Sequence, residues 1–159
     1  MFIRTYTKVL IFFQIWQQTK IARADHNRIK KQSTIEFYNL LSTDSYALYD
    51  VIKDNTLDLS TILSNEELRD CVRRYLGRLE RLAIGVASNV YDFDILNVMC
   101  GQYLIRRYEQ LVTYITHVRD TEGYKMAYKE FELLIERIKE RKKTHSEQTV
   151  DSSICIKEL

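Results

Sequence analysis

The chain has 159 residues, of which 45% are hydrophobic and 29% are charged, and its formal net charge is +2. A chain of this length and composition forms one folded domain with a sizeable core, which excludes an intrinsically disordered protein. The net charge is too small to indicate a nucleic-acid or membrane partner by itself.

Proline is absent from the sequence, and glycine occurs only four times. Helices joined by short turns suit this composition, whereas an all-β fold needs both residues at its many turns. We therefore expect an all-α fold, a single helical bundle of about five to six helices with a long N-terminal helix. The cysteines, Cys71, Cys100 and Cys155, form no C-x-x-C pair, so we expect neither a disulfide framework nor a zinc site, and a cytoplasmic location.

Residues 1–31 are expected to form an amphipathic helix with aromatic and basic side chains. The apolar run at residues 9–16 contains Gln14 and is far shorter than the ~20 residues that cross a bilayer, and no signal-peptide cleavage site follows it. Apolar side chains recur four and three residues apart: Phe2, Tyr6, Val9, Phe13 and Trp16. This spacing is typical of a helix that packs in a core or dimer, and equally of an interfacial helix lying on a membrane.

Five cations follow these aromatic residues, against a single acid, Asp25: Lys20, Arg23, Arg28, Lys30 and Lys31. Such a basic stretch can bind phosphate, either of nucleic acid or of anionic lipid. A solvated helix face explains the same residues more simply.

The bundle itself is expected over residues 32–143. Ser33 with Glu36 has the S-x-x-E spacing of a capping box, which predicts a helix start, and residues 42–45 are polar and predict its end. A second short helix is expected from residue 46, and a connector of one helical turn or a packed loop leads to residue 63.

The longest helical period lies at residues 65–92, with a second capping box, Ser64 with Glu67, at its start. Apolar side chains recur there at three- and four-residue steps, so one face can meet a core: Leu68, Val72, Tyr75, Leu76, Leu79, Leu82, Ala83, Val86 and Val90. Gly85 stands among small residues, which would let another helix approach closely.

Glu80 lies at the margin of this apolar face, where a buried carboxylate is costly unless a cation meets it. The next helix, expected at residues 95–118 after a cap at Asp92 or Asp94, carries Arg106 and Arg107 midway along it. We therefore expect one of these arginines to form a structural ion pair with Glu80.

A last helix is predicted from a heptad-like series of apolar residues: Tyr124, Tyr128, Phe131, Ile135 and Ile138. From residue 144 to residue 159 the sequence is mostly hydrophilic, and we expect a disordered tail there.

Three stretches, RIKKQSTIEFYNLL, RRYLGRLERLAIGVASNVYDFDIL and LIRRYEQLVTYITHVR, resemble a family of short, helical, mostly bacterial proteins known only as a domain of unknown function. The resemblance covers about residues 28–141 and depends on these positions: Thr34, Leu79, Glu80, Gly85, Tyr91, Asp92 and Arg119. It implies an all-α domain, preceded in many relatives by a membrane-spanning helix for which the aromatic segment of this chain is too short. It also implies a structural polar core formed by Glu80, Tyr91, Asp92 and Arg119.

Motifs of helical enzymes are missing from the sequence. Di-iron sites need E-x-x-H, and the residues three before His26, His117 and His145 are not acidic. H-E-x-x-H and phosphate-binding glycine loops are absent too. Helical nucleases resembling the HEPN class place four to six residues between Arg and His, whereas only three separate Arg141 from His145. We therefore expect no metal site, no cofactor and no catalytic residue, and an enzyme is the least favoured class.

Two functional hypotheses remain. The first is a non-catalytic interaction module that binds a protein partner or a second copy through its N-terminal helix, or acts as a peripheral regulator at the inner face of the membrane. The second is a nucleic-acid-binding module that uses the cations of residues 20–31.

Overall fold

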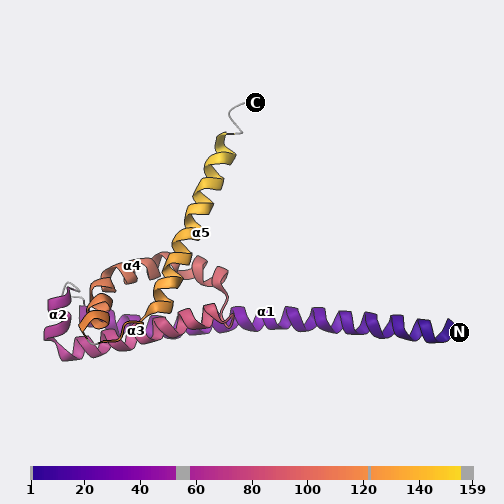
Figure 1. Ribbon diagram of the computed structural model, residues 1–159, viewed down its shortest axis with the longest axis horizontal. Coiled ribbons are helices and arrows are strands. Elements are labelled where there is room, and N and C mark those ends of the chain that lie inside the picture. The colour runs from indigo at the N-terminus through magenta and orange to yellow at the C-terminus, as the bar shows by residue number, and fades with distance from the viewer. Residues whose placement is uncertain (1, 53–57, 122, 155–159) are drawn as a thin grey trace.

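The computed structural model describes the backbone of residues 2–52, 58–121 and 123–154, and the side chains of residues 11–41, 58–121 and 123–144. Within these ranges every regular element is a helix: α1 (Phe2–Ile52), α2 (Leu59–Ser64), α3 (Glu66–Ala87), α4 (Phe93–Thr121) and α5 (Lys129–Ile154). The predictions of an all-α fold and of a long N-terminal helix are confirmed (Figure 1).

The helices of the bundle surround one core. α1 and α5 each pack against both α3 and α4, and the short α2 packs against α3 and α4 at one end. Around the bundle the order is therefore α1, α3, α5, α4. Only the C-terminal part of α1 belongs to this arrangement, because its N-terminal part runs outward beyond the bundle (Figure 1).

α1 is one continuous helix, so two expectations about it are wrong. Ser33 lies inside the helix instead of opening one, and residues 42–45 do not end it. No glycine or proline interrupts residues 2–52, and the helix packs on the bundle through buried Thr34 and Leu41. Tertiary packing therefore outweighs the weak helix-breaking tendency of a few polar residues.

α3 carries the apolar face that its periodicity predicts. Leu76, Leu79 and Leu82 are completely inaccessible to solvent, and the other predicted positions up to Val86 are also buried. Val90 is the exception, with 55% of its surface exposed, because α3 ends at Ala87 and the chain has already left the helix.

The cap of α3 lies one residue later than its capping-box motif predicts. The Asn65 side chain accepts the backbone N–H of Leu68 at 3.0 Å. Ser64 instead ends α2, where its hydroxyl donates to the Thr61 carbonyl at 3.1 Å. Asn and Ser are both good N-cap residues, so residue preference alone does not decide which of the two caps the helix. The backbone conformation decides it. The expected connector before α3 is α2, a helix of six residues.

α5 begins later than its apolar series predicts. Phe131, Ile135 and Ile138 are buried as expected, but Tyr124 lies in the turn before the helix with 66% of its surface exposed. At its other end α5 continues to Ile154, into the segment expected as a tail, and residues 155–159 lie outside the described part of the chain.

Candidate interaction surface and its anchor

The N-terminal part of α1 stands apart from the bundle (Figure 1). Every side chain of residues 11–29 is exposed, and the first buried side chain of α1 among those described is Thr34. We call residues 11–31 the arm. Because a helix in solution gains most of its stability from packing, an arm of this kind is a candidate contact for another molecule.

Two aromatic side chains of the predicted interaction surface lie together near the outer end of the arm. The rings of Phe13 and Trp16 are 6.0 Å apart between centroids, and the Lys20 ammonium lies 4.0 Å from the Trp16 ring centroid. Phe13 and Trp16 are 52% and 48% exposed. The side chains of the other three predicted residues, Phe2, Tyr6 and Val9, lie outside the described part.

The apolar surface of the arm is wider than the predicted series. Phe12 is 76% exposed, and Ile11 and Ile15 are also exposed. With Phe13 and Trp16 they cover about 200° of the helix circumference near the outer end of the arm. Sequence reasoning followed one side of the helix and overlooked these residues, although the unbroken run at residues 9–13 was the signal. Clusters of exposed apolar residues mark interaction sites in folded proteins.

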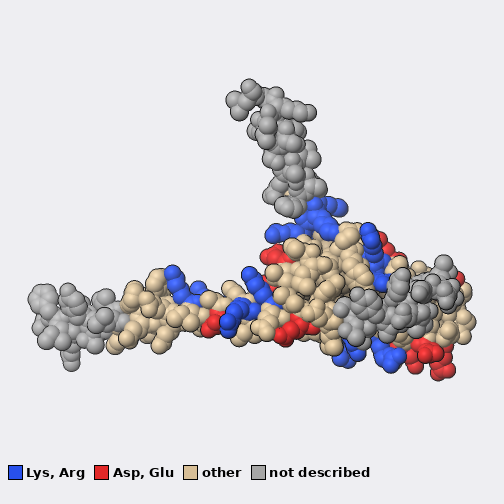
Figure 2. Space-filling model, turned by 180° about the vertical axis from the view of Figure 1, so that it is seen from behind, with Lys and Arg blue, Asp and Glu red and all other residues tan. Residues whose placement is uncertain are grey.

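The five predicted anion-binding cations divide into two groups. Lys20, Arg23, Arg28 and Lys31 are exposed on the arm, and Figure 2 shows such blue side chains spaced between its outer end and the bundle. Lys30 is instead half-buried and donates to the Asn89 side-chain oxygen at 2.5 Å, so it helps attach α1 to the turn after α3.

The aromatic and basic residues share one side of the arm. At about 100° per residue, Phe13, Trp16, Lys20, Arg23 and Lys31 fall within about 80° of the helix circumference. The same steps of three and four residues continue to Thr34, Phe37 and Leu41, which pack on the bundle. The arm therefore presents its aromatic and basic residues on the side that faces the bundle further along the helix, and we call this side the arm face.

Thr34 anchors the arm. Its side chain is completely buried, its hydroxyl donates to the Lys30 carbonyl at 2.8 Å, and its oxygen accepts the backbone N–H of Asp92 at 2.7 Å. Asp92 in turn caps α4, since its carboxylate accepts the Ile95 N–H at 3.0 Å. One hydroxyl thus connects α1 to the turn between α3 and α4.

Tyr91 completes this anchor by packing between α1 and α3. Its ring centroid lies 5.1 Å from that of Phe37, and a Cβ added to Gly85 would lie only 2.3 Å from its ring carbons. The Gly85 carbonyl accepts the N–H groups of Val90 and Tyr91. Gly85 therefore makes room for the Tyr91 ring, not for another helix as predicted.

Among the described residues Glu80 pairs with neither Arg106 nor Arg107, so this prediction is wrong. Its two carboxylate oxygens accept the backbone N–H groups of Glu130 and Phe131, at 3.2 and 2.8 Å. Arg106 is exposed, and Arg107 lies over the Tyr103 ring and donates to Gln110. Glu80 is instead the cap of α5, where unpaired N–H groups and the helix dipole both favour a carboxylate.

Arg119 lies at the same helix start but has other partners. Its Nε donates to the Ala127 carbonyl at 2.9 Å, and its Nη1 lies 3.3 Å from the Glu132 carboxylate. Glu132 also accepts hydrogen bonds from Lys129 at 2.8 Å and from the Tyr108 hydroxyl at 3.0 Å. The pKa of Glu132 is lowered, chiefly by the hydrogen bond from Lys129. The hydrogen bond from Tyr108 and the positive charge of Arg119 lower it further.

The predicted polar core is therefore two separate clusters. Tyr91 and Asp92 belong to the anchor of the arm, and Glu80 and Arg119 hold the start of α5. The sequence singled out these four residues, but it could not show that they belong to two places or which chain segments they connect.

The side chains that could bind a metal or act as a nucleophile do not form a reactive site among the described residues. No cluster of three His, Cys, Asp or Glu side chains suited to a metal ion occurs among the described residues. His117, near the end of α4, has its Nδ1 3.3 Å from the Thr121 hydroxyl. Burial raises the pKa of the Cys100 thiol to about 12, which leaves it protonated and unreactive at neutral pH.

None of the helices that the structure describes is both long enough and apolar enough to span a bilayer. No curated protein and no solved structure matches the sequence. A family model does match it, over residues 5–138, and this range includes the arm as well as the bundle. The chain therefore belongs to the family described as Domain of unknown function (DUF4760).

Proposed function

We propose that this protein is a non-catalytic helical interaction module, in which the bundle supports the arm and the arm face binds a protein partner. The observation that carries the proposal is that residues 11–29 are exposed along their whole length, with Phe12, Phe13 and Trp16 among them. A lone helix in water is only marginally stable, so a partner that covers these rings would stabilise both the helix and the complex.

The chemistry of the arm face favours a partner that is both apolar and acidic. Phe13 and Trp16 offer rings for burial, and Lys20, Arg23 and Lys31 lie beside them on the same side. Aromatic anchors inside a charged rim are typical of protein interfaces.

The position of the bundle favours a protein over a membrane. The bundle lies on the same side of α1 as the arm face, since Thr34 and Leu41 continue the arm-face series. The bundle projects on this side and would keep a flat bilayer away from the arm face. A compact protein is small enough to bind in the space between the arm and the bundle.

Two double variants with the same change of charge provide the test. Phe13→Glu with Trp16→Glu removes both rings, and Gln17→Glu with Gln18→Glu keeps them. Sedimentation velocity of the full chain tests binding of a second copy, and purification from the native host with quantitative mass spectrometry tests other proteins. We expect the first variant to lose its partner and the second to keep it.

Two results would contradict the proposal, and they can be told apart. If both double variants keep the same partners and oligomeric state as the natural chain, the arm face does not bind protein. If the natural chain instead floats with vesicles containing phosphatidylserine and the ring variant does not, the arm binds lipid, and the proposed protein partner is wrong.

The exposed cations favour nucleic acid as the second candidate, since Lys20, Arg23, Arg28 and Lys31 lie on the arm without an adjacent acid other than Asp25. For binding to nucleic acid, the logarithm of the binding constant would fall linearly with the logarithm of the salt concentration. Changing Lys20 and Arg23 to Ala would reduce that slope by about 2, while the matched pair Arg74→Ala and Arg81→Ala on α3 would leave it unchanged. Absence of binding at low salt would reject this candidate.

A further inference from the structure

The side of α1 that packs on the bundle continues along the arm without a change of spacing. Thr34, Phe37 and Leu41 lie three and four residues apart and pack against the bundle. Toward the N-terminus the same alternation of three and four residues continues on the arm face through Lys30, Asn27, Arg23, Lys20, Trp16 and Phe13. This alternation is the spacing with which one helix packs along another. It therefore indicates that a helix covers the arm face.

The covering that the bundle provides stops at the base of the arm. Inside the bundle this side of α1 lies against α3, α4 and the turn between them. Lys30 binds the Asn89 side chain in that turn, and the next residue of the turn, Val90, is exposed. From Asn27 to Phe13 every side chain of the arm face is exposed. A helix bound there would begin beside the turn and extend the packing of the bundle outward.

The chemistry of the arm face changes along its length. Its rings lie at the outer end, and its exposed cations, Lys20, Arg23 and Lys31, lie nearer the bundle. Residues 1–31 contain a single acid, Asp25, and at about 100° per residue it lies on the side of the helix opposite Trp16. A helix that matches the arm face therefore needs apolar residues at its outer end and carboxylates at the end beside the bundle.

A second copy of the arm does not offer these groups. Its arm face carries the same rings and cations, so pairing in either direction leaves Lys20, Arg23 and Lys31 without a carboxylate. Parallel pairing would also bring the two bundles together, because each lies on the arm-face side of its own α1. These features favour a helix of a different protein.

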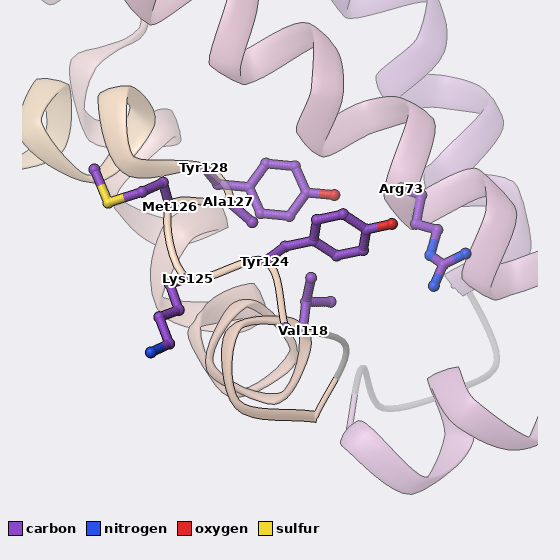
Figure 3. A pocket seen from close by; sticks show the side chains of 8 residues that line it. Arg73, Val118, Tyr124, Lys125, Met126, Ala127 and Tyr128 are labelled. Carbon is purple, nitrogen blue, oxygen red and sulfur yellow. The ribbon is translucent and has the colours of Figure 1, made fainter.

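The pocket of the bundle lies away from this surface. It has a volume of about 760 Å³ and opens beside the turn from α4 to α5, where Tyr124 and Tyr128 line it (Figure 3). This turn is at the end of the bundle that carries α2, whereas the arm leaves the bundle at the other end (Figure 1). A helix bound along the arm face therefore does not reach the pocket.

We propose that the arm face binds an amphipathic helix of a different protein, about 18 residues long, with an apolar outer half and an acidic half beside the bundle. The length follows from the distance between Phe13 and Lys31, which is about 27 Å at 1.5 Å per residue. Such a helix is one kind of partner for the proposed function, and its assignment rests on that function.

Two synthetic peptides of about three heptads are the probes. The first has leucine at the a and d positions of one half and glutamate at those of the other half, and the second has lysine in place of the glutamate. Trp16 is the only tryptophan of the chain, and the peptides have none, so its fluorescence in the full chain reports contact at the arm face. We expect the glutamate peptide to shift the Trp16 emission to shorter wavelengths and to bind at least about tenfold more tightly than the lysine peptide.

Charge reversal on the arm separates a matched helix from general attraction. Lys20→Glu with Arg23→Glu should reverse the preference, so that the lysine peptide becomes the tighter ligand. Arg74→Glu with Arg81→Glu makes the same change of charge at exposed positions of α3 and should leave the glutamate peptide the tighter ligand.

Absence of an emission shift with either peptide, equal affinity for both, or the same reversal in both double variants would overturn the acidic helix. A protein cross-linked through the arm face in the native host would still support the proposed function in that case. The failure of the acidic helix and the failure of the proposed function are therefore distinguishable.

Discussion

The backbone N–H of Asp92 donates to the buried hydroxyl of Thr34 at 2.7 Å, across a sequence separation of 58 residues. This hydrogen bond joins the first buried residue of α1 to the turn between α3 and α4. It is also where α1 changes from a helix packed in the bundle to an exposed arm. The attachment and direction of the arm therefore depend on this contact and its neighbours.

Thr34→Val tests the anchor, because valine keeps the shape and removes the hydroxyl. The Asp92 N–H would lose its acceptor in a buried site, so we expect a loss of about 1–3 kcal/mol in the free energy of unfolding. Thr19→Val is the matched control, since Thr19 makes the same bond to the carbonyl four residues before it but is exposed on the arm. Urea unfolding measures both. Equal effects of the two substitutions would show that the Asp92 contact contributes nothing.

Gly85→Ala and Gly77→Ala should change stability in opposite directions. Both glycines lie inside α3, where alanine is a better helix former by about 1 kcal/mol. At Gly77 nothing lies within 4 Å of the added Cβ, so we expect a gain up to that size. At Gly85 the Cβ would lie 2.3 Å from the Tyr91 ring, so overpacking should cost about 1–3 kcal/mol. Stabilisation by both substitutions in thermal unfolding would mean that Tyr91 does not pack there.

Glu80→Gln should reduce stability although the partners of Glu80 in the described part of the chain are backbone N–H groups and not an arginine. The amide can offer only one oxygen to the N–H groups of Glu130 and Phe131 and carries no charge for the helix dipole, so we expect a loss of about 1–2 kcal/mol. Arg106→Gln should change the free energy of unfolding by no more than about 0.5 kcal/mol, as is usual for exposed residues. Similar losses for both would support an ion pair between them. Denaturant unfolding at neutral pH distinguishes these results.

Glu132 should make stability depend on pH in the acid range. Its pKa is lowered in the folded chain, chiefly by the hydrogen bond from Lys129, so folding favours the ionised form. The resulting stabilisation is complete above the ordinary pKa of 4.5 and is lost as the pH falls through the lower folded value. Glu132→Gln should therefore lower the free energy of unfolding at neutral pH. Below about pH 4.5 the stability of this variant should fall less steeply than that of the natural protein. Unchanged acid unfolding of this variant would show that the Lys129, Tyr108 and Arg119 contacts do not favour the carboxylate.

The sequence predicted best the features that depend on local periodicity. Leu76, Leu79 and Leu82 recur at helical steps, and they are fully buried because only one side of α3 is apolar. The buried Phe131, Ile135 and Ile138 of α5 were predicted for the same reason. Periodicity fixes which side of a helix is buried, but it does not identify the chain segment that covers that side.

The contacts made by polar side chains could not be predicted in this way. Glu80 was correctly identified as a residue in need of partners, but its partners are the backbone N–H groups of Glu130 and Phe131. Backbone groups leave no residue-type signal in a sequence, so the arginines appeared to be better candidates. The pocket beside Tyr124 was missed because it depends on a turn, and its tyrosines were assigned to the apolar series of α5.

The proposed function requires the arm to bind its partner through one side of the helix. Trp16 lies on the arm face, and Gln18 lies about 200° further around the same helix. A photo-reactive phenylalanine analogue placed at each position in turn, in the native host, reports which side meets another protein. We predict covalent adducts with a defined partner from position 16 and not from position 18. Adducts from both positions alike, or from neither, would contradict the proposed function.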